Sequence, residues 1–394
     1  MKWISAVSTE RDFDAALTDA GAALRSQLGS TQPHLIVLFA SPHHAEHYER
    51  VPEAIAAQFG SAILIGCSAG GVIGGGKEIE QRPGLSLTAA VLPDVELVPF
   101  HVDAAAVLEH DESFAWENHI AVPAATRPHF LLLADPFTFD AETFLRALDH
   151  TYPGSQKIGG LASGATQPGA NALFLGADVH RSGLVGVALS GNVEVDTVVA
   201  QGCRPVGQPM FITKCHENIL WELDGEPAVK VLQELFARLD PADQELARVS
   251  LFLGIVMSEN QQEYRQGDFL IRNIVGMDTS RGVLAIGAHL HENSVVQFHL
   301  RDAQTSGQDV EQLLSRYAAV ERSAQPRGAL LFSCLGRGVY LYGEADYDTK
   351  VFRRYLGDVP LGGFFCNGEI GPVHGTTFVH GYTSSFGLFR SRDV

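Results

Sequence analysis

Cysteine is scarce in this sequence, and the few cysteines lie far apart. The 394 residues contain five of them, Cys67, Cys203, Cys215, Cys334 and Cys366, without a Cys-x-x-Cys pair. This odd, scattered set excludes a disulfide framework and a zinc ribbon, and it is typical of a reduced cytoplasmic protein. We therefore expect a cytoplasmic location.

Runs of basic residues and long apolar segments are also missing. The chain has 46 acidic and 28 basic residues, which gives a formal net charge of −18 at pH 7. Such a charge repels phosphate backbones and anionic lipid surfaces, so we expect no nucleic-acid partner. No segment approaches the roughly 20 apolar residues that span a bilayer. The amino terminus shows no signal-peptide pattern, and we expect no membrane association.

What the sequence does contain is one pattern that occurs three times. An apolar strand is followed by a helical stretch, a second strand that enters a glycine segment, and a third strand. The first strands are PHLIVLFASP (33–42), PHFLLLADP (128–136) and RGALLFSCLGRG (327–338). The glycine segments are LIGCSAGG (64–71), KIGGLASG (157–164) and PLGGFFCNGEIGP (360–372). A helical crossover predicts that the first two strands are parallel, and the glycines allow the third to return antiparallel.

These patterns predict an α/β fold with duplicated mixed β-sheets flanked by helices. Four further strands are expected in the block 249–302, with amphipathic helices before and after it. The composition becomes loop-like near residues 201–215. We therefore predict two domains, 1–205 and 206–394, each built from strand-helix-strand-strand repeats.

Two short motifs and one histidine pair suggest other chemistry. GVIGGGKE (71–78) matches a P-loop up to Lys77, but Glu78 stands where Ser or Thr would hold Mg²⁺, and no long helix is expected to follow. HHAEH (43–47) matches an inverted zinc-protease pattern without a clear third ligand. His289 and His291 would share one face of a strand, as an edge pair or a metal pair. We expect none of these to hold a metal, and we expect no cofactor.

Several segments together resemble the FIST family, sensory domains named for F-box and intracellular signal transduction. LLFSCLGRG, GGFFCNGEIGP and HGYTSSFGLFR are similar to the FIST C-terminal domain, and LIVLFASP followed by ILIGCSAGGVIG is similar to its N-terminal domain. The resemblance covers roughly residues 30 to 390. It implies binding of a small ligand, such as an amino acid or a small carboxylate, and a signal passed to a partner protein. The chain would be a stand-alone version of such a sensor.

The resemblance also implies a ligand site in the glycine-rich loops. The matching residues are Cys334, Gly336, Arg337, Gly338, Gly362, Gly363, Asn367, Gly368, Glu369, His380, Thr383, Gly66, Cys67, Ser68 and Gly70. Strand-end loops of α/β sheets form clefts, which agrees with this concentration. Arg337 offers a planar fork for a carboxylate and Glu369 a counter-charge for an amine. The alternative is that these two charges pair with each other or cap loops.

Two other function classes stay open. Cys334 or Cys366, with His374 and His380 following, could serve a cysteine-dependent hydrolase or transferase. No known cysteine-hydrolase signature is present, and buried cysteines are commonly packing residues, so we expect ligand binding rather than catalysis. A protein-interaction scaffold is also compatible with the acidic composition.

Overall fold

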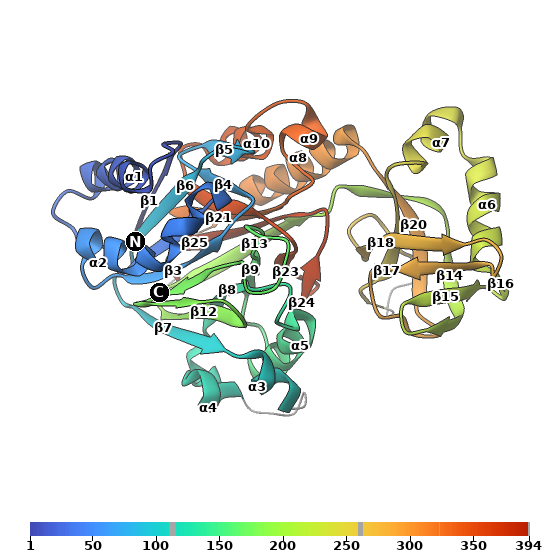
Figure 1. Cartoon of the computed structure of the whole chain (residues 1–394), viewed down its shortest axis with the longest axis horizontal. Coiled ribbons are helices and arrows are strands. Elements are labelled where there is room, and N and C mark those ends of the chain that lie inside the picture. Colours follow the sequence, from blue (N-terminus) through green and yellow to red (C-terminus); the bar gives the residue numbers. More distant parts are fainter. Residues whose placement is uncertain (110–115, 259–262, 323, 393–394) are drawn as a thin grey trace. The chain divides into compact units, whose positions relative to one another are not determined.

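The computed structural model describes residues 1–109, 116–258, 263–322 and 324–392, and they form two compact units (Figure 1). Unit 1 comprises Met1–Val199, Glu311–Val379 and Thr383–Val394. Unit 2 comprises Ala200–Val310 and His380–Tyr382. The fold is α/β, with mixed sheets flanked by helices as the sequence predicts.

Unit 1 contains three six-stranded sheets built on one strand order. Sheet 1 runs β1 (Lys2–Ser8), β6 (Leu85–Val91), β2 (Leu35–Ala40), β3 (Ile63–Ser68), β10 (Leu173–Leu175) and β11 (Asp178–His180). Sheet 2 runs β7 (Val95–Val102), β12 (Leu184–Gly191), β8 (His129–Ala134), β9 (Lys157–Leu161), β23 (Glu369–Val373) and β24 (Thr376–His380). Sheet 3 runs β13 (Glu194–Ala200), β25 (Ser384–Arg390), β21 (Gly328–Cys334), β22 (Leu361–Cys366), β4 (Gly71–Gly74) and β5 (Lys77–Glu80).

The strand directions predicted from the sequence are confirmed in all three sheets. The pairs β2–β3, β8–β9 and β21–β22 are parallel. The third strands, β6, β12 and β25, return antiparallel beside the first. A helix lies between the two parallel strands in each case, because a parallel connection needs a crossover.

Each sheet is completed by a hairpin from another segment of the chain. The β4–β5 hairpin follows β3 of sheet 1 but pairs with β22 of sheet 3. The β10–β11 hairpin follows β9 of sheet 2 but pairs with β3 of sheet 1. Strand β23 follows β22 of sheet 3 and pairs with β9 of sheet 2. The three sheets are therefore interlocked through the segments that follow their glycine-rich strands.

One glycine in each parallel pair is required by a close backbone approach. A Cβ atom at Gly66, Gly159 or Gly363 would lie 2.0, 1.8 or 1.9 Å from a carbonyl oxygen of the neighbouring strand. Gly159 and Gly363 also have φ values of +153° and +149°, which L side chains rarely adopt. The third equivalent position is Gly363, one residue later than a simple alignment of the sequence at Gly362 suggests.

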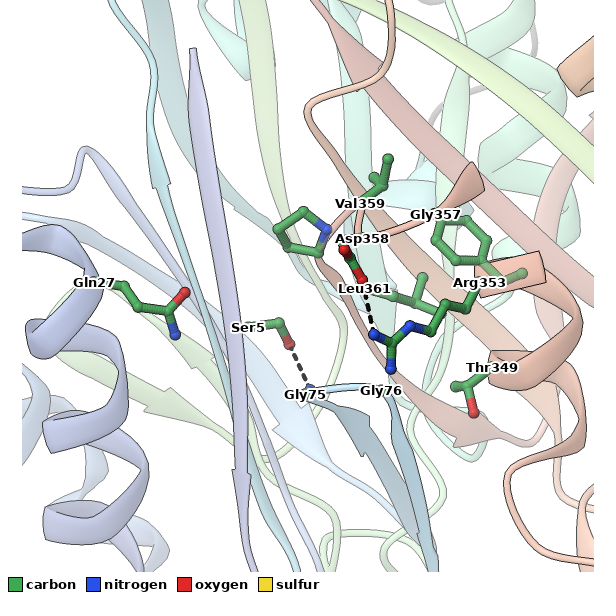
Figure 2. Close-up of a pocket in the computed structure, with 12 residues that line it drawn as sticks. Ser5, Gln27, Gly75, Gly76, Thr349, Arg353, Gly357, Asp358, Val359 and Leu361 are labelled. Carbon is green, nitrogen blue, oxygen red and sulfur yellow. Dashed lines mark hydrogen bonds and ion pairs between the residues drawn. The ribbon is translucent and has the colours of Figure 1, made fainter. Parts of the chain in front are cut away.

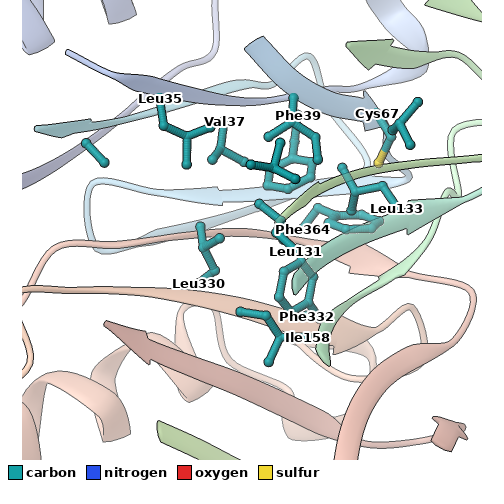
Figure 3. Packing of buried hydrophobic residues seen from close by; sticks show 14 of the residues in the cluster. Leu35, Val37, Phe39, Cys67, Leu131, Leu133, Ile158, Leu330, Phe332 and Phe364 are labelled. Carbon is teal, nitrogen blue, oxygen red and sulfur yellow. The ribbon is translucent and has the colours of Figure 1, made fainter. Parts of the chain in front are cut away.

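Helices cover the outer faces of the sheets, and an apolar core fills the space between the three sheets. The helical elements of this unit are α1 (Phe13–Leu28), η1 (Pro42–Arg50), α2 (Val51–Phe59), α3 (Ala104–Glu109), α4 (Trp116–Ile120), η2 (Ala124–Thr126), α5 (Ala141–Thr151), α9 (Val339–Tyr342) and α10 (Tyr347–Leu356), with α8 (Ala303–Ala319) entering from unit 2. Figure 3 shows side chains of all three sheets packed together, among them Phe39 and Cys67 of sheet 1, Leu133 of sheet 2, and Phe364 of sheet 3. This shared core is what fixes the strand ends that carry the site.

Unit 2 is a closed antiparallel barrel, and its described residues include helices α6 and α7 and the first part of α8. Its elements are β14 (Cys203–His216), β15 (Ile219–Leu223), β16 (Glu226–Pro227), α6 (Ala228–Arg238), α7 (Pro241–Ala247), β17 (Leu251–Val256), β18 (Phe269–Asp278), β19 (Val283–Ile286) and β20 (Val295–Arg301). The sheet order β14-β20-β17-β18-β19-β15 is closed by the pairing of β14 with β15. The strands and flanking helices predicted for residues 249–302 are present. His289 and His291 lie beyond the end of β19 rather than on one strand face.

The grouping in space differs from the linear division at residues 205 and 206. All three strand-helix-strand segments lie in unit 1. The third is joined to the first because the β4–β5 hairpin, which follows β3, pairs with β22. Unit 2 contains only antiparallel pairings among its described residues. The linear division into 1–205 and 206–394 stays a prediction about domains along the chain.

Candidate functional site

The three glycine segments, residues 64–71, 157–164 and 360–372, meet in the interior of unit 1. The Ser163 hydroxyl accepts the Gly70 N–H at 2.8 Å and donates to the carbonyl of Phe365. The Asn367 side-chain amide donates to the carbonyl of Ala162 at 3.0 Å. These bonds hold the segments together, so most of their backbone serves packing.

A pocket of about 170 Å³ opens where two of these segments meet the loop after β21. It is lined by Gly70, Gly71, Glu80, Gln81, Leu335, Tyr340 and Phe365. We call it the strand-end pocket, because it lies at the carboxyl ends of the parallel strands β21 and β22. Clefts at such strand ends are the usual ligand sites of α/β sheets.

The pocket combines an acidic group with apolar walls. Glu80 Oε1 accepts the Val339 N–H at 3.0 Å. Burial raises the pKa of Glu80. Gly338 has φ +65° and ψ −146°, a backbone conformation that essentially only glycine adopts, and a Cβ there would also lie 2.4 Å from this carboxylate. Leu335 and Tyr340 are 40% and 84% exposed, and their surfaces are available to a bound molecule.

A buried ionic cluster lies beside the pocket. Arg337 Nε donates to Asp348 Oδ2 at 3.0 Å, and both side chains are almost completely buried. Ser384 Oγ donates to the same oxygen at 2.6 Å, and Tyr342 also contacts both charged groups. Although burial acts to raise it, the Arg337 guanidinium holds the pKa of Asp348 below its ordinary value.

A second buried carboxyl group, that of Glu78, adjoins this cluster, and among the described residues no cation forms an ion pair with it. Its Oε1 accepts the Thr349 N–H at 2.8 Å at the start of α10. Its Oε2 is buried and has no hydrogen-bond partner within the described part of the chain. Burial, together with the nearby Asp348 carboxylate, raises the pKa of Glu78 to about 8. Glu78 is therefore mainly protonated at neutral pH.

A second pocket, of about 240 Å³, lies at the other end of β22 (Figure 2). Ser5 of β1, the β4–β5 turn and the end of α10 line it, and Figure 2 shows Arg353 and Asp358 paired among the lining residues. This ion pair is exposed, at 73% and 87% of the two side chains, and it lies near the amino end of β22. The strand-end pocket is the stronger candidate because it has a partly buried charge and lies at carboxyl strand ends.

Comparison with known proteins places the chain in a family. The FIST N domain model matches residues 34–226, and the FIST C domain model matches residues 228–372. The chain belongs to the FIST family. FIST domains are associated with small-ligand sensing and signal transduction.

Full-length relatives of this FIST chain occur in mycobacteria. An uncharacterized protein of Mycobacterium tuberculosis is 37% identical over 97% of this chain and 98% of its own. An uncharacterized protein of Mycobacterium bovis is 34% identical over 97% of each chain. F-box only protein 22 of Homo sapiens is 29% identical over 101 residues, which are 25% of each chain.

The predicted ligand residues of the FIST chain fall into three groups. Gly70 lines the strand-end pocket. Cys334 and Gly336 flank its Leu335 in the chain, and Gly338 lies over its Glu80. Gly66, Gly362, Gly363 and Gly368 sit where a Cβ would collide with a neighbouring strand or side chain. Cys67, Ser68, Arg337, Glu369, His380 and Thr383 are buried, and Asn367 bonds Ala162.

Arg337 and Glu369, which the sequence suggested as a zwitterion-binding pair, have internal partners. Each side chain is 0% exposed. Arg337 pairs with Asp348, and Glu369 accepts the Thr383 N–H at 3.1 Å. Neither presents its charge to solvent in this structure. Ligand contact by these two residues remains a prediction.

Sequence reasoning missed Glu80, Gln81, Leu335, Tyr340 and Phe365 as pocket residues. Glu80 and Val339, which hydrogen-bond each other, are 259 positions apart, and no local pattern links them. A usable signal was the exposed apolar group in LGRGVYLY, where Val339 and Tyr340 follow directly after the glycines.

The two alternative motifs take other structures. The P-loop-like segment forms the β4–β5 hairpin, so a strand follows its glycines where a phosphate-binding loop needs a helix. HHAEH lies on η1, and the described residues contain no cluster of three or more His, Cys, Asp or Glu side chains that could hold a metal. In the described part of the chain no helix has the length and apolarity to cross a membrane.

Proposed function

We propose that this FIST-family protein is a cytoplasmic small-ligand sensor that acts through a partner protein and binds its ligand in the strand-end pocket. The observation that carries the proposal is a partly buried carboxylate, Glu80, at the edge of an apolar pocket of about 170 Å³. A pocket smaller than the roughly 300 Å³ typical of drug-sized ligands suits a molecule of few heavy atoms. A cytoplasmic setting agrees with its five cysteines, which are all thiols.

The charge at the pocket favours a ligand with an amino group. Glu80 would pair with an ammonium group, and the apolar body would contact Leu335, Tyr340 and Phe365. Asp346 and Asp348 lie close enough to act on Glu80 electrostatically, so an anion would be repelled. Of the two classes suggested by the sequence, amino acids and related amines are supported over small carboxylates.

A matched ligand series tests this choice by calorimetry. 2-Phenylethylamine, phenylalanine and 3-phenylpropionate carry the same ring with a cation, a zwitterion and an anion. We expect affinity to fall in that order. Glu80→Gln keeps the shape and the contact with Val339, and it should weaken the amine at least about tenfold, because a charged hydrogen bond is lost. Asp358→Asn, at the second pocket, is the matched control and should change nothing.

Two results would count against the proposal. Equal affinity for all three compounds would mean that Glu80 does not pair with the ammonium group. Binding that is lost in Asp358→Asn but kept in Glu80→Gln would move the ligand to the pocket of Figure 2. Because burial raises the pKa of Glu80, amine affinity should also decrease as the pH is lowered and the carboxylate is protonated.

The rim of the pocket offers a surface through which ligand binding could be reported. Val339 and Tyr340 of α9 are 44% and 84% exposed, which is unusual for large apolar side chains in a row. A partner that contacts this rim would sense whether the pocket is filled. Recovery of the same partner with and without 2-phenylethylamine would instead favour a constitutive interaction scaffold.

A further inference from the structure

Two cysteines face each other across neighbouring strands beside the pocket. In the parallel register of β21 and β22, Cys334 is the direct partner of Cys366. Paired strands lie about 4.8 Å apart, and a disulfide accepts Cα separations from about 4.4 to about 6.8 Å. Both side chains project to the same face, since Phe332 and Cys366 belong to one core cluster and strand side chains alternate.

The two thiols differ in exposure and in their partners. Cys334 is half-buried, whereas Cys366 is 0% exposed. The Gly336 N–H donates to Cys334 Sγ at 3.4 Å, a contact that stabilises the thiolate. Cys366 Sγ–H faces the Ser333 carbonyl at 3.4 Å and Glu369 Oε1 at 3.5 Å, and both burial and the Glu369 carboxylate raise the pKa of this thiol. Cys334 is thus suited to meet an oxidant, and Cys366 to react second.

We propose that Cys334 and Cys366 form a redox-active dithiol that closes to an intramolecular disulfide when a hydroperoxide is present. In the first step the Cys334 thiolate attacks one peroxide oxygen, the O–O bond breaks, and Cys334 becomes a sulfenic acid while hydroxide or alkoxide leaves. In the second step the Cys366 sulfur attacks the Cys334 sulfur, the S–O bond breaks, and the thiol proton passes to the departing oxygen, which leaves as water. The hydroxide or alkoxide of the first step takes up the proton that Cys334 lost and becomes water or an alcohol, and two electrons pass from the thiols to the peroxide.

The same geometry makes the bond reversible. Each cysteine is the last residue of its strand, so the two ends can draw together without loss of the strand ladder. A disulfide formed by such a displacement departs from relaxed geometry, and strained disulfides are the more easily reduced ones. Burial raises the pKa of the Cys366 thiol, so the second step should be faster at alkaline pH. This inference is independent of the proposed ligand.

Peptide mapping of the oxidised full-length protein tests the pairing. Reduced protein is treated with hydrogen peroxide, alkylated, and digested with trypsin without a reductant. We expect peptide 328–337, which carries Cys334, linked to peptide 355–390, which carries Cys366, at the mass of the two peptides less two hydrogens. Dithiothreitol should separate them again. Cys215→Ser, a change at another half-buried thiol, should leave the linkage intact.

Variants separate the two steps. In Cys366→Ala the sulfenic acid on Cys334 should persist and react with dimedone, whereas Cys334→Ser should show neither label nor linkage. Wild-type mapping decides the matter if either variant is insoluble. Oxidation of Cys334 to sulfinic acid without the linked peptide would overturn the inference, and so would a linkage of Cys366 to Cys67 or no thiol loss before unfolding.

Discussion

The β4–β5 and β10–β11 hairpins occupy equivalent places in sheets 3 and 1, yet one carries a buried carboxyl group where the other carries an alkyl group. Ile73 lies opposite Gly363, and Phe174 lies opposite Gly66. Across each two-residue turn, Ile73 then pairs with Glu78 and Phe174 with Val179. Val179 packs against the apolar cluster under α2, and Phe174 meets the Tyr48 ring at 5.7 Å.

This difference shows which features of the hairpin the strand pairing requires and which it does not. The fold accepts an aliphatic side chain at the hairpin position, so the carboxyl group of Glu78 is not required for the strand pairing. A buried polar atom without a partner costs about 1–3 kcal/mol, and Glu78 Oε2 is such an atom among the described residues. Groups retained against such a cost are commonly functional. The acidic hairpin is also the one that supplies Glu80 to the strand-end pocket.

The largest effect is expected from removing Arg337, the cation of the buried ionic cluster that adjoins the β4–β5 hairpin. Arg337→Met leaves the Asp348 carboxylate buried without its partner, and we expect a loss of about 3–5 kcal/mol in the free energy of unfolding. Urea unfolding followed by circular dichroism measures it. The matched control is Arg353→Met, which removes the exposed pair with Asp358 and should change stability by less than about 1 kcal/mol. Similar losses of unfolding free energy in both variants would show that the buried ion pair of Arg337 and Asp348 stabilises the fold no more than the exposed pair does.

A second test concerns the pH dependence that Glu78 gives to the acidic hairpin. Its pKa is about 8 in the folded chain, raised from 4.5 by burial and by Asp348. Between these pH values the folded state holds a proton that the unfolded state releases, so stability should fall as the pH rises. The slope approaches about 1.4 kcal/mol per pH unit. Glu78→Gln keeps the acceptor for Thr349 and should lack this slope.

The measurement is the difference between wild type and Glu78→Gln in urea unfolding from pH 5 to pH 8. Burial lowers the pKa of His129 and His299 to about 4, so these groups add an opposite slope below the ordinary histidine pKa. They titrate in both proteins and cancel in the difference. Parallel pH profiles would mean that Glu78 has an ordinary pKa and that the hairpin is not distinguished by a buried proton.

The strand plan was predictable from sequence because it is written in local patterns. Apolar runs of five or six residues bounded by Gly or Pro indicate buried strands, and a helical stretch between two of them indicates a parallel pair. The exchange of hairpins between sheets was not predictable, since nothing local in GVIG states that it pairs with β22 rather than β3. The placement of the third segment in unit 1 follows from that exchange.

The candidate site was predictable only in its location. Glycines after β3 and β21 indicated where backbone segments converge, and Gly70 does line the pocket. The charges could not be assigned in the same way. Arg337 was expected to face a ligand, but Asp348, eleven residues later in the chain, neutralises it. The partly buried charge at the pocket is that of Glu80, which a distant loop crosses at Gly338, and no local sequence pattern indicates this contact.

The smallest expected effect comes from moving the carboxyl group to the other hairpin. Val179 is only half-buried, and β11 is the outermost strand of sheet 1. A glutamate introduced by Val179→Glu can turn its carboxylate toward water, so the loss should be about 1 kcal/mol, from reduced apolar burial. Because the new group stays hydrated, stability should show no added slope from pH 5 to pH 8, in contrast to Glu78. Val179→Gln is the matched uncharged control in the same urea titration. A slope present with glutamate and absent with glutamine would mean that either hairpin raises the pKa of a carboxyl group. Burial beside Asp348 would then not be the reason for the raised pKa of Glu78.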